Sequence, residues 1–122
     1  MSKRVLIVDD SMYMRTMIQS ALEEAGYDVV GQAANGEAAI DLAIEMEPDL
    51  ITLDNILPDM IGIDILKVLK QEESIASKVV MISAVGQESV IQEGMDLGAS
   101  DYIVKPFTQD GLVDKVNAVL CA

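Results

Sequence analysis

The chain has 122 residues, enough for one domain with a sizeable core, and its 51% hydrophobic and 24% charged residues are typical of a globular protein. The 8 basic and 21 acidic residues give a net charge of −13, which repels nucleic acids and anionic membranes. The single cysteine, Cys121, excludes a disulfide framework, and the lack of histidine excludes Ser-His-Asp triads and histidine metal sites.

The first predicted element is a strand at residues 4–8, an apolar run that is too short for a signal-peptide core. Further strands are expected at residues 29–33, 50–53, 79–82 and 102–104. Several of them are apolar throughout, as strands buried on both faces are. No apolar run approaches the roughly 20 residues of a membrane span. We therefore expect a cytoplasmic protein.

Segments with helical spacing lie between and after these strands. Their apolar faces are formed in turn by Met14, Ile18, Leu22 and Ala25; Ala38, Ala39, Leu42 and Ala43; Ile63, Leu66 and Leu69; Val90, Ile91 and Met95; and Leu112, Val116, Val119 and Leu120. Gly26 and Gly98 should close the first and fourth helices. The alternation predicts one α/β domain over residues 1–122, a doubly wound five-stranded parallel sheet of order 2-1-3-4-5 with five helices.

Polar residues follow four of these strands, at ends that should meet on one edge of the sheet. Asp9 and Asp10 follow the first strand, Asp54 the third, Ser83 the fourth and Lys105 the fifth. Three carboxylates in one pocket repel each other unless a cation joins them, and an all-oxygen site suits Mg²⁺. A carboxylate can also attack phosphorus to form an aspartyl phosphate. We therefore expect a Mg²⁺-assisted phosphoryl acceptor, in which Lys105 and Ser83 neutralise and position the transferred group.

Each of these residues also has an ordinary structural interpretation. Asp10 could help to cap the first helix, Lys105 alone would be a surface lysine, and Ser83 alone would be a cap or a core hydroxyl. Lone aspartates after strands are usually turn formers or caps. We interpret in that way Asp28, Asp49 and Asp59. The joint occurrence at four strand ends favours function over these separate explanations.

The same segments resemble the receiver domain of two-component response regulators, and within that family the stand-alone chemotaxis type. The similar segments are VLIVDDS at 5–11, Asp54 with LPDMIG at 57–62, SAVGQ at 83–87 and DYIVKPF at 101–107. The resemblance implies that Asp54 is the phosphoacceptor. It implies that Mg²⁺ is held by Asp9, Asp10, Asp54 and the backbone carbonyl of Ile56, and that the phosphoryl group is contacted by Ser83 and Lys105.

The resemblance also implies how a signal would enter and leave. A histidine kinase would supply the phosphoryl group, and the domain would promote only its own phosphotransfer and autodephosphorylation rather than act as an enzyme. Ser83 and Tyr102 would form a switch pair, and the Lys105–Pro106 peptide would be cis, which proline permits. Because the sequence holds no output domain after the fifth predicted helix, we expect output through a motor or adaptor protein.

That partner would bind the face of helix four, strand five and helix five. The candidate contacts are Ile91, Met95, Tyr102 and Lys115, of which Met95 could equally be a core filler. We expect a monomer that binds neither nucleic acid nor membrane. A dedicated phosphatase is a further candidate partner.

A few positions depart from the family pattern. Asn55 stands where an apolar residue is usual, and Leu57 replaces a common methionine. Ile56 and Val85 are apolar and border the path of the attacking water, so we expect them to prolong the phosphorylated state. Gly94 lies inside the fourth predicted helix and should weaken it by about 0.5–1 kcal/mol relative to alanine. Replacing Gly94 by alanine is therefore expected to stiffen this helix.

Three other classes of protein fit the sequence less well. A flavodoxin-like redox protein needs a hydroxyl- and glycine-rich phosphate loop after the first strand, where this chain has two aspartates, and it needs aromatic residues, which are scarce here. A phosphatase of the haloacid dehalogenase type places its two aspartates two residues apart, whereas these are adjacent. A non-phosphorylated interaction domain is disfavoured because every expected catalytic position is filled.

Overall fold

The computed structural model describes residues 2–84 and 87–121, over which five strands and five helices alternate. The strands are β1 (Arg4–Val8), β2 (Asp28–Ala33), β3 (Leu50–Asp54), β4 (Lys78–Ala84) and β5 (Asp101–Lys105). The helices are α1 (Met12–Glu24), α2 (Gly36–Met46), α3 (Gly62–Gln71), α4 (Glu88–Asp96) and α5 (Gln109–Cys121). Each strand contains the one predicted from the sequence. None of the helices within the described ranges has the length and apolarity to cross a bilayer.

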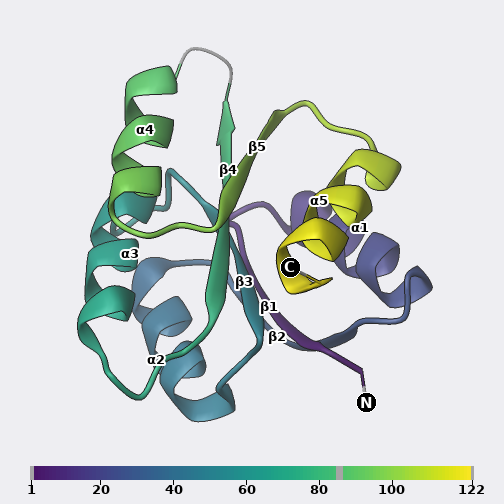
Figure 1. Cartoon of the computed structure of the whole chain (residues 1–122), viewed down its shortest axis with the longest axis horizontal. Coiled ribbons are helices and arrows are strands. Elements are labelled where there is room, and N and C mark those ends of the chain that lie inside the picture. Colours follow the sequence, from purple (N-terminus) through teal and green to yellow (C-terminus); the bar gives the residue numbers. More distant parts are fainter. Residues whose placement is uncertain (1, 85–86, 122) are drawn as a thin grey trace.

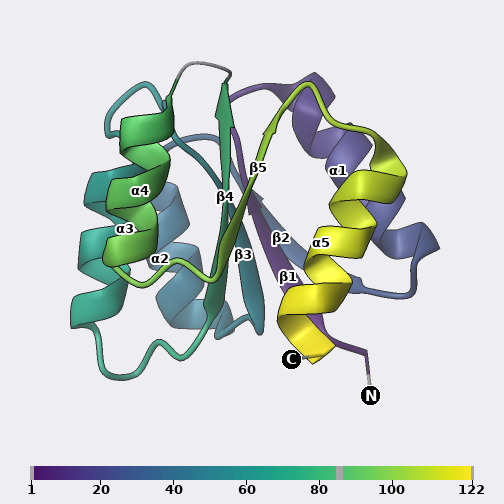
Figure 2. The same ribbon diagram turned by 45° about the horizontal axis from the view of Figure 1, so that its top comes forward.

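The strands form a parallel sheet in the order β2-β1-β3-β4-β5 (Figure 1), which confirms the predicted doubly wound fold. Helices α1 and α5 cover one face of the sheet, and α2, α3 and α4 cover the other (Figure 2). The direction of winding therefore reverses between β1 and β3. In such sheets a ligand site is expected at the carboxyl ends of the two neighbouring strands whose connections lead to opposite faces, here β1 and β3.

Successive residues of β1 point into two separate cores. Leu6 and Val8 pack on the side of α2, α3 and α4, whereas Val5 and Ile7 pack on the side of α1 and α5. All four are fully buried, and burying a side chain of this size contributes roughly 1.5–3 kcal/mol. This two-sided burial explains why the central strands are apolar throughout, and it holds their carboxyl ends on a rigid base.

The helix ends agree with the glycine pattern but not with a role for Asp10. Ser11 is the N-cap of α1, because its side chain accepts a hydrogen bond from the backbone N–H of Met14 at 3.2 Å. Asp10 is therefore not the cap. Gly26 and Gly98 follow α1 and α4 with φ values of 94° and 108°, the left-handed conformation that the sequence predicts for both.

Gly94 serves close packing between α4 and β4. It is buried, and a Cβ atom at this position would overlap the Sδ atom of Met81 on the strand beneath it. The expectation that alanine would stiffen this helix considers only local helix propensity, and this tertiary contact opposes it. Met95 packs against the same core, which supports its interpretation as a core filler.

Candidate functional site

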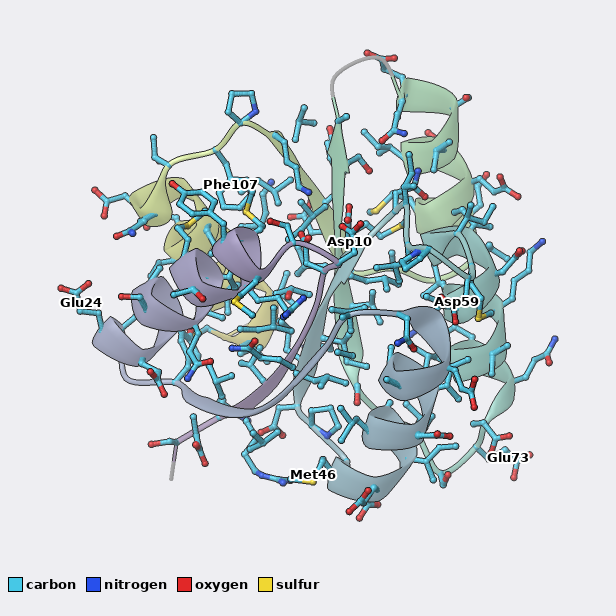
Figure 3. The ribbon with its side chains drawn as sticks, turned by 180° about the vertical axis from the view of Figure 1, so that it is seen from behind. Asp10, Glu24, Met46, Asp59, Glu73 and Phe107 are labelled. Carbon is cyan, nitrogen blue, oxygen red and sulfur yellow. The ribbon has the colours of Figure 1, made fainter. Side chains whose placement is uncertain are left out.

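Three carboxylates meet where β1 and β3 end. One carboxylate oxygen from each of Asp9, Asp10 and Asp54 lies within 4.8 Å of the other two. Asp9 is fully buried, Asp54 is 8% exposed and Asp10 is exposed. Figure 3 shows Asp10 where the chain leaves β1 for α1. The structure therefore brings together the three residues that the sequence proposed as metal ligands, in a cluster that opens to solvent on one side.

Lys105 crosses the end of the sheet to reach this cluster. Its Nζ atom lies 3.3 Å from Oδ2 of Asp9 and 3.5 Å from Oδ1 of Asp54, so it forms ion pairs with both. The peptide bond between Lys105 and Pro106 is cis, as expected. The side chain of a residue at the end of the edge strand β5 is thus placed between the two central strands.

The electrostatics of the cluster centre on Asp54. Burial and the charge of Asp9 raise the pKa of Asp54 above its ordinary value of 3.8, while Lys105 acts in the opposite direction and Asp10 adds a smaller rise. The ammonium of Lys105 therefore balances only part of the carboxylate charge. A divalent cation would remove the remaining repulsion.

The donor set fits Mg²⁺. The atoms that converge are carboxylate oxygens, which Mg²⁺ prefers to nitrogen or sulfur. The exposed side of Asp10 leaves room for the water ligands that Mg²⁺ retains. Arg15 lies at the edge of the site, where its Nη1 atom donates to the backbone carbonyl of Asp9 at 2.7 Å rather than to the Asp9 carboxylate.

The loop between β3 and α3 carries the expected carbonyl ligand. Ile56 is 59% exposed and forms an isolated antiparallel bridge with Ile61 across this loop. The role of its carbonyl as a ligand stays a prediction. Val85, the other apolar residue expected beside the attacking water, lies outside the described residues, as does Gly86.

Two buried side-chain oxygens lie next to the cluster without a hydrogen-bond partner in the described parts of the chain. These are Oγ of Ser83 and Oδ1 of Asn55. The backbone N–H of Asn55 donates to the carbonyl of Ile82, which places Asn55 beside Ser83 at the end of the ladder. An unsatisfied buried polar atom costs roughly 1–3 kcal/mol. Ser83 Oγ therefore has a hydrogen-bonding capacity that the described residues leave unused. The burial of Asn55 was not foreseen from the sequence.

Tyr102 lies on the neighbouring strand and points away from the core. It is 37% exposed and pairs in register with Met81, two residues before Ser83. The Nζ atom of Lys115 lies 5.5 Å from the centre of the Tyr102 ring and 3.4 Å from Oδ2 of Asp101. The two proposed switch residues are thus on adjacent strands, one buried and one held at the surface.

The remaining aspartates have different outcomes. The Asp59 carboxylate accepts hydrogen bonds from the backbone N–H groups of Gly36 and Glu37, which confirms a capping role and lowers its pKa. Asp49 accepts a hydrogen bond from the backbone N–H of Arg4 at 2.8 Å. Asp28 is the first residue of β2, so its interpretation as a cap or turn former is wrong.

Large apolar side chains are exposed on two segments that border the cluster. Met12 and Tyr13 are 72% and 79% exposed at the start of α1, and Ile56 and Ile61 are exposed in the loop after β3. Sequence reasoning missed Met12 and Tyr13. Neither residue falls on the apolar face predicted for this helix, and that position could have marked them as exposed apolar residues.

Comparisons with known proteins agree with the geometry. The pattern of the response regulator receiver domain family matches residues 5–117. The chemotaxis protein CheY of Thermotoga maritima is 42% identical over 119 residues, which cover 98% of each chain. The phosphate regulon transcriptional regulatory protein PhoB of Pseudomonas aeruginosa is 41% identical over 97% of this chain and 52% of its own length. The solved structure of CheY4 of Vibrio cholerae, a chemotaxis response regulator, matches 98% of this chain and all of its own with a TM-score of 0.91 and 31% identity.

Proposed function

The chain belongs to the response regulator receiver domain family, and on that premise we propose that Asp54 accepts a phosphoryl group from a histidine kinase while Asp9, Asp10 and Asp54 hold Mg²⁺. The observation that carries the proposal is the convergence of three carboxylates beside the Lys105 ammonium. Family membership removes the flavodoxin-like and dehalogenase-type alternatives. A receiver domain transmits a signal and does not turn over an external substrate.

The chemical step is the transfer of one phosphoryl group. A carboxylate oxygen of Asp54 attacks phosphorus, a new O–P bond forms, and the P–N bond of a phosphohistidine breaks, leaving its electron pair on the imidazole. Asp54 must be ionised to attack. Lys105 opposes the effect of burial on its pKa and so keeps the nucleophile available. Bound Mg²⁺ would supply charge neutralisation for the phosphoryl oxygens.

The unpaired Ser83 hydroxyl is the proposed link from chemistry to signal. It can donate a charge-assisted hydrogen bond to a phosphoryl oxygen, which would satisfy a buried group that lacks a partner in the described chain. Movement of Ser83 toward the phosphoryl group would leave space that Tyr102 can enter from the adjacent strand. The output face then changes at Tyr102, Ile91 and Lys115, where we place the binding of a motor or adaptor protein.

The exposed apolar residues around the pocket offer contacts that a protein phosphodonor can use and that a small phosphodonor does not need. Met12 and Tyr13 on one side and Ile56 and Ile61 on the other offer apolar contacts beside a strongly acidic centre. A kinase domain that covers them would exclude water while it places its phosphohistidine against Asp54. The relatives named as chemotaxis proteins support a chemotaxis pathway for this exchange.

Intact mass spectrometry tests the proposal. The protein is exposed to a small acyl phosphate with Mg²⁺, with chelator in place of Mg²⁺, or as the Asp54→Asn variant. We expect the mass of one phosphoryl group on the wild type with Mg²⁺ and no addition in the other two samples. Labelling of Asp54→Asn, or an acid-stable phosphate on Ser83, would falsify the assignment.

A further inference from the structure

The loop between the phosphoacceptor strand and α3 is fastened to a helix that is distant in sequence. Oδ1 of Asp59 accepts a hydrogen bond from the backbone N–H of Gly36 at 2.7 Å, and Oδ2 accepts one from Glu37 at 3.1 Å. Both donors belong to the first turn of α2, and Figure 3 shows Asp59 in the loop beside that turn. The carboxylate therefore joins loop 55–61 to α2 by two bonds.

Asp59 does not act as the N-cap of α2 in the usual local way. Asn35 already fills that position, and its Oδ1 accepts a hydrogen bond from the backbone N–H of Ala38 at 2.8 Å. The first turn of α2 is thus satisfied by two side chains, one from the helix itself and one from the loop. Of these two side chains, Asp59 is the one that comes from the loop bordering the candidate site.

Packing fastens the same loop at two more points. A Cβ atom added to Gly36 would lie 2.6 Å from Sδ of Met60, so Met60 rests directly on the start of α2. A Cβ atom added to Gly62 would lie 2.8 Å from the backbone oxygen of Asp54, so the far end of the loop is pressed against the phosphoacceptor strand. The backbone N–H of Leu57 donates to the carbonyl of Met60 at 3.1 Å and closes the loop on itself.

Ile56 is one of several exposed residues of this loop, together with Pro58, Asp59 and Ile61. Its side chain is exposed, and it lies between the strand end and the anchor on α2. Because Mg²⁺ demands near-ideal octahedral geometry, a carbonyl ligand whose position is not fixed binds it poorly. The anchor at Asp59 is therefore placed to decide how well the loop backbone serves the metal site.

We propose that Asp59 is a positioning residue of the metal site, whose carboxylate holds loop 55–61 against α2 and so fixes the Ile56 carbonyl for Mg²⁺. The inference rests on the proposed function and on the ligand role that the family resemblance implies for the Ile56 carbonyl. The competing explanation is that Asp59 only stabilises α2, in which case loss of its bonds would lower stability and leave metal affinity unchanged.

Two caps on the same helix turn provide a matched pair of variants. Asp59→Ala removes the bonds from the loop, and Asn35→Ala removes the bond from within the helix. Mg²⁺ affinity of each apo protein is measured by isothermal titration calorimetry, and Tm is measured in chelator. We expect both variants to melt earlier, but only Asp59→Ala to bind Mg²⁺ more weakly, by roughly tenfold, the lower end for loss of a residue that supports metal ligands.

Asp59→Asn separates position from charge. The amide keeps one oxygen that can accept a hydrogen bond from the start of α2, but it removes the negative charge. It should therefore retain much of the affinity that Asp59→Ala loses. If the two variants bind Mg²⁺ equally weakly, the effect of Asp59 is long-range charge and the positioning role is overturned.

The outcomes distinguish this inference from the function on which it rests. If the wild type does not bind Mg²⁺, the proposed function fails, and the positioning role fails with it. If the wild type binds Mg²⁺ and Asp59→Ala binds it equally well, only the positioning role fails. Should Asp59→Ala not fold, Asp59→Leu takes its place against Asn35→Ala, because leucine keeps a side chain of similar size but accepts no hydrogen bond from Gly36 or Glu37. Equal Mg²⁺ affinities of these two variants would overturn the role of Asp59.

Discussion

Replacing Gly94 by alanine tests how α4 is held against the sheet. The new methyl group would overlap Sδ of Met81, which is buried in the core, so the methionine must shift. Overpacking of this kind costs roughly 1–3 kcal/mol, and alanine returns about 0.5–1 kcal/mol of helix propensity. Since methionine adapts more readily than other core residues, we expect a net loss of about 1 kcal/mol in the free energy of unfolding.

A double-mutant cycle isolates the contact. Met81→Ala alone should cost about 2–5 kcal/mol because it leaves a cavity. In that background Gly94→Ala meets no sulfur, so it should be neutral or stabilising by up to about 1 kcal/mol. Urea unfolding followed by circular dichroism gives all four free energies. An alanine at 94 that stabilises the protein with Met81 in place would refute the packing argument and restore the explanation from helix propensity.

Three further predictions concern the acidic cluster. Millimolar Mg²⁺ should raise the Tm relative to chelator, because it binds only the folded state, and a wild type that melts at the same temperature in both would contradict the site. Because the pKa of Asp54 is raised, the folded state binds more protons than the unfolded state above pH 3.8, so this residue lowers stability as the pH rises through that window. In urea unfolding at neutral pH, Asp54→Asn should therefore be more stable than the metal-free wild type. Equal stability of the two proteins would show that the buried charge of Asp54 does not destabilise the fold. Lys105→Arg should slow phosphoryl labelling despite its equal charge, because the forked guanidinium does not fit a site built for a compact ammonium, and an unchanged rate in time-resolved mass spectrometry would argue against direct contact.

The fold and the carboxylate cluster could be predicted because both follow from local patterns. Buried parallel strands read as apolar runs, and in a doubly wound sheet their carboxyl ends must share an edge. Once the strands ending before Asp9 and Asp54 are recognised, the convergence of those residues needs no distance information. Lys105 joins them for the same reason, since the end of β5 lies on the same edge.

The features that the sequence did not predict depend on contacts between distant segments. Asp59 caps a helix turn that lies 22 and 23 residues earlier, and no local signal names the helix that a loop aspartate will meet. Gly94 looks like a weak point of its helix when only propensity is considered, and its packing on Met81 appears only when α4 and β4 are placed together. The burial of Asn55 likewise depends on the neighbouring strand β4.

The most direct test of the central claim is to locate the phosphoryl group chemically. The phosphorylated protein is reduced with borohydride, which converts an aspartyl phosphate into homoserine, and its peptides are sequenced by mass spectrometry. The account predicts homoserine at position 54 in the wild type treated with Mg²⁺ and an acyl phosphate, and an intact aspartate there in the sample with chelator. Homoserine at Asp9 or Asp10, or a phosphorylated protein with no homoserine at all, would contradict it.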